Sequence, residues 1–222
     1  MRSASLRPMP ALLERLARDH RGVALIEFAF VLPVLLLAGL LGLETTNLVL
    51  AHMRVSRIAS MVADNGSRVR DSIDETDIIE LMQGAELAAD TLDLRQNGRV
   101  ILSAVQENAG KTGQWIRWQR CYGRKAVASN YGAAGKGKSD ASLPSIGSDG
   151  RAVRAVSGST VMLAELSFDY QPLITGAWGG KATTIHYESV FNVRSRPNTD
   201  PTNSSKLKAS ETARCTSPSF GG

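Results

Sequence analysis

The feature that most restricts what this chain can fold into is an uninterrupted apolar run near its N-terminus. Val23 to Leu43 covers 21 residues, and Glu27 is the only charged residue among them. A helix of this length rises roughly 31 Å, close to the ~30 Å hydrocarbon thickness of a bilayer. A buried core helix would need polar residues on at least one side, and Phe28 to Leu43 contains none. The run is therefore predicted to cross a membrane.

The charges that flank the run predict its orientation. Residues 1–22 carry five arginines against two acidic residues, and positively charged flanks stay in the cytoplasm. We therefore expect a single span with the N-terminus in the cytoplasm and the rest of the chain outside the inner membrane. A cleaved secretory signal is a weaker alternative, because the run exceeds the usual length of about 7 to 15 residues and Glu27 interrupts it.

Glu27 raises the question of why a membrane segment retains a carboxylate. Such a charge is costly in a bilayer and usually marks a function or a partner. In one interpretation its side chain simply reaches the nearby cytoplasmic headgroups. In the other, cleavage between Gly22 and Val23 creates an amino terminus about 6 Å from Glu27 along the helix axis. In a filament of staggered helices, Glu27 would pair with the amine of a neighbouring subunit, which offsets much of its desolvation cost.

The segment RGVALIEFAFVLPVLLLAGLLGLE, residues 21–44, resembles the opening of the TadE/TadG-like family of pilus assembly proteins. The family elements fall on Arg21-Gly22, Ile26-Glu27-Phe28-Ala29, Leu32-Pro33-Val34-Leu35 and Gly42-Leu43-Glu44. The likeness is specific because two acids and a proline recur at fixed spacing within apolar sequence. The Glu27-Phe28 pair also resembles the Glu-Tyr or Glu-Phe pair of the tight-adherence (Flp, type IVc) pilins.

The resemblance implies a minor pilin-like (pseudopilin) membrane protein that takes part in assembling a tight-adherence pilus and its secretion machine. A prepilin peptidase would cleave between Gly22 and Val23, and Glu27 with Phe28 would guide subunit docking. Other Tad pilins and minor pilins, inner-membrane platform proteins and the lipid bilayer would be the partners. The alternative is an uncleaved single-pass scaffold or assembly factor with a periplasmic domain.

Pro33 lies inside the predicted span. It removes one backbone donor and frees the carbonyl of Ala29, so a kink is expected. Such a bend would let the helix flex during filament packing. A proline that is merely tolerated in a membrane helix is an equal alternative.

Beyond Glu44 the helix is predicted to continue as a stem. Apolar residues recur there at intervals of three and four, which is typical of an amphipathic helix; they are Leu48, Ala51, Val55, Ile58 and Val62. Asn65-Gly66 is a stop signal, so the stem is expected to end at about residue 64.

The sequence patterns in residues 65–194 predict a small periplasmic α+β domain. A second helix begins near Asp74, after a capping box read from Ser72 to Glu75, and runs towards Leu94. Alternating strand patterns follow, at residues 99–106, 114–122, 159–172 and 183–193. About four strands joined mostly by short turns predict an antiparallel sheet packed on the stem helix, as in a pilin-like domain.

The predicted domains are thus a cytoplasmic basic leader (1–22), a transmembrane helix (23–44) that continues as the stem, the α+β domain (65–194) and a flexible tail (195–222). The tail is rich in Pro, Ser and Thr and contains Cys215, one of two cysteines in the chain. In an oxidising periplasm we expect a disulfide between Cys121 and Cys215, worth up to about 4 to 5 kcal/mol. The alternative is two unpaired thiols.

Several function classes receive no support from the sequence. Aromatic residues make up 5% of the chain and form no basic patch with stacking rings, so no nucleic-acid binding is expected. Gly132–Ser139 fits the phosphate-loop pattern, but its flanks lack the strand and helix that nucleotide binding requires. Cysteine and histidine spacing predicts no metal site, and we expect no cofactor. His186 has no nucleophile or acid beside it in the pattern, so no catalytic residue is proposed and no enzyme is expected.

Overall fold

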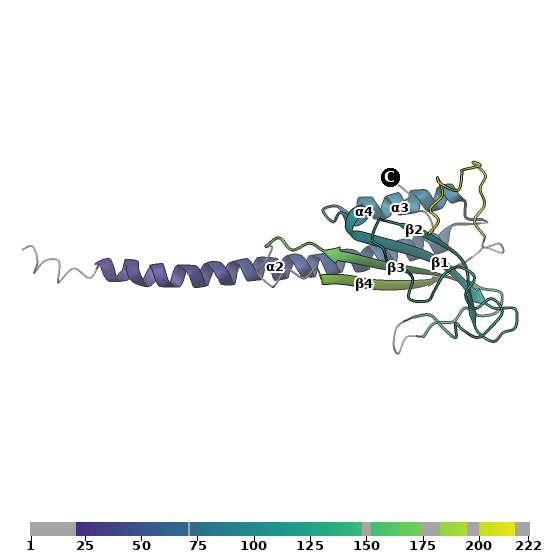
Figure 1. The fold of residues 1–222 in the computed structure, drawn as a ribbon, viewed down its shortest axis with the longest axis horizontal. Coiled ribbons are helices and arrows are strands. Elements are labelled where there is room, and N and C mark those ends of the chain that lie inside the picture. The colour runs from purple at the N-terminus through teal and green to yellow at the C-terminus, as the bar shows by residue number, and fades with distance from the viewer. Residues whose placement is uncertain (1–20, 71, 148–151, 175–182, 195–199, 216–222) are drawn as a thin grey trace, which may run out of the picture. The chain divides into compact units, whose positions relative to one another are not determined.

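The computed structural model describes residues 21–70, 72–147, 152–174, 183–194 and 200–215. The chain divides into two compact units, Met1–Thr46 and Asn47–Gly222. Helix α2 (Arg21–Arg68) contributes its first part to one unit and its second part to the other. The predicted α+β class is confirmed, with a long N-terminal helix, a further helix and a four-stranded antiparallel sheet (Figure 1).

The second part of α2 packs on the sheet along the stripe that the sequence predicts. Ala51, Val55, Ile58 and Val62 are buried in the main core, and Leu48 packs against its rim. Their spacing of three and four residues places them on one helix face, so burial of that face ties the helix to the domain.

Helix α2 ends at Arg68, beyond the predicted stop at Asn65-Gly66. Gly66 is helical, and a Cβ at this position would lie 3.4 Å from Met162 Cε. Gly66 therefore lies inside the helix and against the sheet, and does not end the helix. Asp64 strengthens the last turn by accepting a hydrogen bond of 2.8 Å from Arg68 Nε, one turn along the helix.

Helix α3 (Glu75–Ala89) begins next to Asp74, as predicted, but its capping box lies two residues later than predicted. Asp74 is the N-cap and accepts from the backbone N–H of Thr76, while Asp77 accepts from the backbone N–H of Asp74. Ser72 is therefore not the cap. Both carboxylates also lie at the positive end of the helix dipole, which favours this start.

The predicted helix to Leu94 is split in two. Asp90 has a φ of 52°, a left-handed conformation that ends α3, and its N–H donates to the carbonyl of Leu87. After a short turn, Asp93 caps a four-residue helix, α4 (Leu94–Asn97), by accepting from the N–H of Gln96. The break allows Leu94 to enter the main core.

The sheet consists of β1 (Gly98–Glu107), β2 (Gln114–Tyr122), β3 (Thr160–Tyr170) and β4 (Thr183–Asn192). Its strand order is β2-β1-β3-β4, and every neighbouring pair is antiparallel. The strand ranges agree closely with the predicted ones. The hairpin between β1 and β2 is short as expected, whereas residues 123–159 form a long connection between β2 and β3.

The two faces of the sheet bury different partners. One face packs on α2, α3 and α4 through the alternating residues predicted for β3, which include Met162, Leu166 and Phe168 (Figure 1). The opposite face carries a smaller core in which Val161 and Leu163 of β3 pack against the long β2–β3 connection. The sheet is thus the middle layer of the Asn47–Gly222 unit.

Candidate functional site

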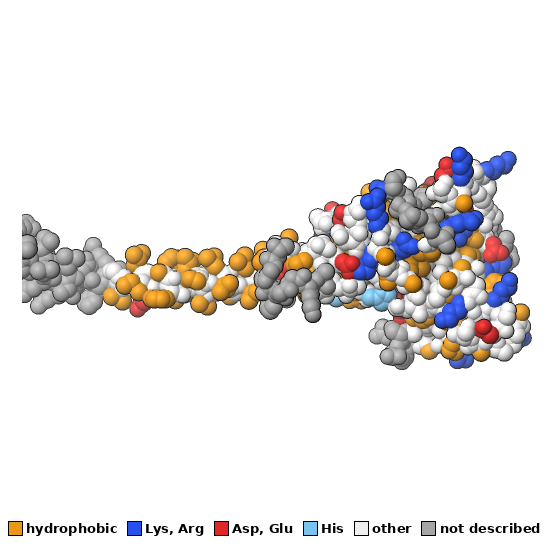
Figure 2. Space-filling model, in the orientation of Figure 1, with side chains coloured by type: hydrophobic (Ala, Val, Ile, Leu, Met, Phe, Trp, Pro, Cys, Tyr) orange, Lys and Arg blue, Asp and Glu red, His pale blue; other side chains and the backbone are white. Residues whose placement is uncertain are grey.

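The first part of α2 presents an apolar surface that the described chain does not cover. From Gly22 to Leu43 every side chain is exposed except that of Leu41, which is half-buried. Figure 2 shows hydrophobic side chains gathered along this part of the helix. By length and composition the helix is able to cross a membrane. An apolar surface of this extent needs lipid or protein around it.

The predicted docking residues lie on this surface. Glu27 is exposed, and Phe28 beside it is 58% exposed. Val23 lies four residues before Glu27 in the same helix, so a terminal amine at residue 23 would lie about one turn, or ~6 Å along the axis, from the carboxylate. The helix thus places the Glu27 carboxylate one turn from the position that the predicted cleavage would make the amino terminus, and pairing between subunits stays a prediction.

The glycines of the predicted motif are not explained by packing within the chain. A Cβ on Gly22 or Gly42 would meet nothing within 4 Å. Pro33 lies inside the helix, as predicted, where it leaves the carbonyl of Ala29 without its usual donor.

The far end of the apolar segment carries the closing acid of the motif. Glu44 is 5% exposed. The next two residues, Thr45 and Thr46, turn their hydroxyls back to donate to the carbonyls of Leu41 and Gly42, each at 2.8 Å. These bonds satisfy the hydroxyls on an apolar helix.

Residues 22–64 match the TadE-like protein family. The match begins at the predicted cleavage position and covers the apolar part of α2 together with most of its packed part. It confirms the resemblance inferred from the motif and suggests involvement in a Tad pilus. No curated protein and no solved structure matches the chain.

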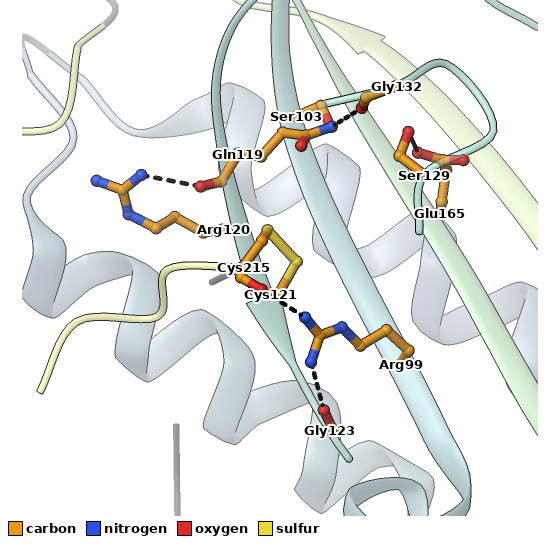
Figure 3. Close-up of a disulfide and its surroundings, with 10 residues drawn as sticks. All are labelled: Arg99, Ser103, Gln119, Arg120, Cys121, Gly123, Ser129, Gly132, Glu165 and Cys215. Atoms are coloured by element: carbon orange, nitrogen blue, oxygen red, sulfur yellow. Dashed lines mark hydrogen bonds between the residues drawn. A yellow bond between two sulfur atoms is a disulfide. The ribbon is translucent and has the colours of Figure 1, made fainter. Parts of the chain in front are cut away.

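A disulfide joins Cys121 of β2 to Cys215, as predicted (Figure 3). The bond spans 94 residues of sequence, and its Cα atoms are 4.7 Å apart. It closes residues 200–215, here named the C-terminal strap, onto the outer edge of β2. The N–H of Cys121 also donates to the carbonyl of Ala213 at 2.6 Å.

Arg99 supports the disulfide from β1. Its guanidinium donates to the carbonyls of Gly123, at 2.8 Å, and of Cys215, at 3.1 Å (Figure 3). Burial lowers the pKa of Arg99 from its ordinary value. Two carbonyl acceptors from distant segments therefore fix the strap beside the bridge.

A second anchor holds the strap at the start of α3. The Asp74 carboxylate accepts from the N–H and hydroxyl of Ser204 and from the hydroxyl of Thr202, at 2.8 to 3.0 Å. The N–H of Ser204 is the main reason that the pKa of Asp74 lies far below its usual range, followed by that of Thr76. The predicted flexible tail is therefore packed over its described part, while residues 195–199 and 216–222 lie outside the described residues.

Two ion pairs lie close to this anchor. Arg120 of β2 pairs with Glu75, the first residue of α3, and both side chains are largely buried. Arg117 pairs with Asp200 at the start of the strap. The strap, β2 and the N-terminus of α3 thus share one network of charged groups.

The opposite face of the sheet holds a buried acid that sequence reasoning missed. Glu165 of β3 is 2% exposed and accepts from Ser129 Oγ at 2.5 Å (Figure 3). It also accepts from the N–H of Asn130 at 2.8 Å. Burial raises the pKa of Glu165. The carboxylate fastens the long β2–β3 connection to the sheet. The sequence did contain a signal for this buried acid, because Glu165 is the only charged residue in the apolar run VMLAELSF.

His186 has neighbours that the strand pattern did not bring together. Its Nδ1 lies 2.8 Å from Ser167 Oγ, and its Nε2 lies 3.1 Å from Asn130 Nδ2. Both ring nitrogens are therefore engaged, and Ser167 is buried. The arrangement bridges β3, β4 and the connection, which is a structural role.

The phosphate-loop pattern adopts a different structure from that of a nucleotide site. Within Gly132–Ser139, the N–H of Gly135 donates to the carbonyl of Ile116 and the carbonyl of Lys136 accepts from the N–H of Ile116. The segment thus extends the edge of β2, and turns rather than a helix follow it. Among the described residues there is no cluster of metal-ligating side chains.

Proposed function

We propose that this protein is a pilin-like subunit, a minor pilin or pseudopilin, that takes part in assembling a tight-adherence type IV pilus and its secretion machine. One observation carries the proposal: the TadE-like match coincides with a helix whose first part is apolar, uncovered and marked by a single acid one turn after Val23. The proposed role is structural rather than enzymatic.

In this proposal the apolar part of α2 anchors the chain in the inner membrane with its N-terminus in the cytoplasm. A prepilin peptidase cuts between Gly22 and Val23 and releases an amine. Glu27 of one subunit then pairs with the amine of another. The pair neutralises a carboxylate that is costly in an apolar environment, so docked subunits are favoured over separate ones.

The Asn47–Gly222 unit supplies the periplasmic part of the proposed subunit. Its disulfide suits an oxidising compartment. The unit would contact other Tad pilins and minor pilins, while platform proteins of the inner membrane would hold the subunit before assembly. Neither nucleotide nor nucleic acid has a place in this role.

Substitution of Glu27 tests the docking role. Glu27→Gln keeps the shape of the side chain but removes its charge, so we expect normal membrane insertion and cleavage with a loss of piliation. Glu80→Gln, at an exposed acid of α3, is the matched control and should assemble normally. Normal piliation of Glu27→Gln would contradict the docking role and favour the uncleaved scaffold.

A further inference from the structure

Within the Asn47–Gly222 unit, helix α2 has a second face that is partly exposed and does not pack on the sheet. Together with Tyr187 of β4, this face lines an open groove of about 410 Å³, here named the stem groove. Its lining residues are Val49, His52, Met53, Ser56, Arg57 and Tyr187. The groove is separate from the buried stripe of α2 that faces the sheet.

The spacing of the groove residues indicates what kind of structure fits there. The α2 positions follow each other at intervals of three, one, three and one, the pattern of a helix-packing face. Val49 is 52% exposed and Met53 is 64% exposed, so the apolar part of this face lacks a partner. Ser56 and Ser60 are small enough to let another helix approach closely. An apolar helix is therefore the natural occupant.

The charge in the groove restricts the occupant further. Arg57 is exposed and has no hydrogen bond or ion pair with any residue that the structure describes. By contrast, Arg54 pairs with Asp90. If a helix covered the stem groove, Arg57 would be desolvated and would need an anion on that helix. The occupant is thus an apolar helix with an acid at the matching position.

The first part of α2 itself has this chemistry. It is apolar and exposed, and Glu27 is the only charge between Val23 and Leu43. The apolar helix has Val23, Glu27 and Phe30 at intervals of four and three residues. The same intervals separate Met53 and Arg57 of the groove from each other and from Ser60, which follows the groove on α2. In parallel helices these two sets therefore face each other pair by pair.

We propose that the stem groove binds the N-terminal apolar helix of a second copy of this chain, with Glu27 of that copy paired to Arg57. The inference rests on the proposed function, because the helix must leave the bilayer to reach the groove of a neighbour. A carboxylate has two oxygens, so Glu27 is able to accept from Arg57 of one neighbour and from the terminal amine of another. Arg57 thereby sets the register in which copies stack.

Cysteine crosslinking between copies tests this register. Two tagged full-length chains, one with Phe30→Cys and the other with Ser60→Cys, are co-expressed in cells that assemble the pilus and then oxidised. We expect a disulfide-linked dimer carrying both tags. Phe30→Cys combined with Leu87→Cys, at an exposed position of α3, is the control and should remain uncrosslinked.

The N-terminus of the same sample separates the two proposals. A chain cut before Val23 that gives no Phe30–Ser60 crosslink overturns the stem groove as a docking site and leaves the proposed function intact; coverage of the groove by bilayer alone would give this result. An uncut chain without the crosslink overturns both proposals.

Charge reversal tests the role of Arg57 directly. Arg57→Glu should lower the crosslink yield by about tenfold or more, the equivalent of ~1.4 kcal/mol, whereas Arg57→Lys should retain most of it. Arg70→Glu makes the same charge change at an exposed arginine outside the groove and should leave the yield unchanged. An equal loss in Arg57→Glu and Arg70→Glu, or a loss in neither, would refute the pairing.

Discussion

Breaking the disulfide between Cys121 and Cys215 should destabilise the domain by an amount set by the loop it closes. The bridge spans 94 residues, and loop-closure entropy for a chain of that length gives about 4.5 kcal/mol at 25 °C. In the folded protein, Asp74 holds the other end of the strap independently. We therefore expect the reduced protein to remain folded but to lose about 3 to 4.5 kcal/mol in its free energy of unfolding.

Urea unfolding of the full chain in detergent measures this loss. Trp115 and Trp118 lie on β2 with Cys121, so their fluorescence reports the unfolding of the strand to which the strap is tied. Reductant should lower the urea concentration at the unfolding midpoint of the wild-type protein. The Cys121→Ala, Cys215→Ala double variant should have this lower midpoint already, and reductant should not change it. A difference below about 1 kcal/mol between the oxidised and reduced proteins would refute the loop-entropy argument.

The remaining predictions concern substitutions of Asp74, Glu165, Gly66 and Gly98. Asp74→Ala should lower the free energy of unfolding by about 1 to 2 kcal/mol through loss of the cap, measured by the same urea assay. Because the pKa of Asp74 is lowered by folding, the wild-type protein should lose stability as pH falls below about 4, and Asp74→Asn should lack this loss; an unchanged acid profile would contradict it. Glu165 has a raised pKa, so its contribution is present below about pH 4.5 and is lost as pH rises through the folded pKa. Glu165→Gln should therefore flatten the stability profile above pH 4.5, and identical profiles would count against a buried carboxylate. Gly66→Ala should stabilise the protein by up to about 1 kcal/mol, because its Cβ meets Met162 at an ordinary distance of 3.4 Å. Gly98→Ala should destabilise the protein, because its Cβ would lie 2.7 Å from the carbonyl oxygen of Leu94. Thermal melts should show a higher melting temperature for Gly66→Ala and a lower one for Gly98→Ala. Equal changes in melting temperature would refute the packing argument.

Periodic features of the sequence were predictable because burial imposes them. The stripe from Ala51 to Val62 and the alternating residues of β3 are set by the repeat of the helix and the strand, and both form the main core. The disulfide was predictable because the chain has two cysteines and an oxidising compartment was expected for them.

Features that depend on single residues or distant contacts were not predictable. The break at Asp90 depends on one left-handed residue that no periodicity marks. The strap is polar and resembles a disordered tail in composition, because hydrogen bonds to Asp74 and the bridge to Cys121, rather than an apolar face, hold it in place. The hydrogen bonds of Glu165 were not predictable either, because their donors lie on a loop more than thirty residues away in sequence.

The proposed docking through Glu27 requires a free amine one helical turn from its carboxylate, and the mature N-terminus tests this requirement most directly. Mass spectrometry of the protein purified from cells that assemble the pilus should give a chain that begins at Val23. A functional protein that retains Met1 and the leader would have no amine beside Glu27, and the pairing of Glu27 with the terminal amine of a neighbouring subunit would be excluded.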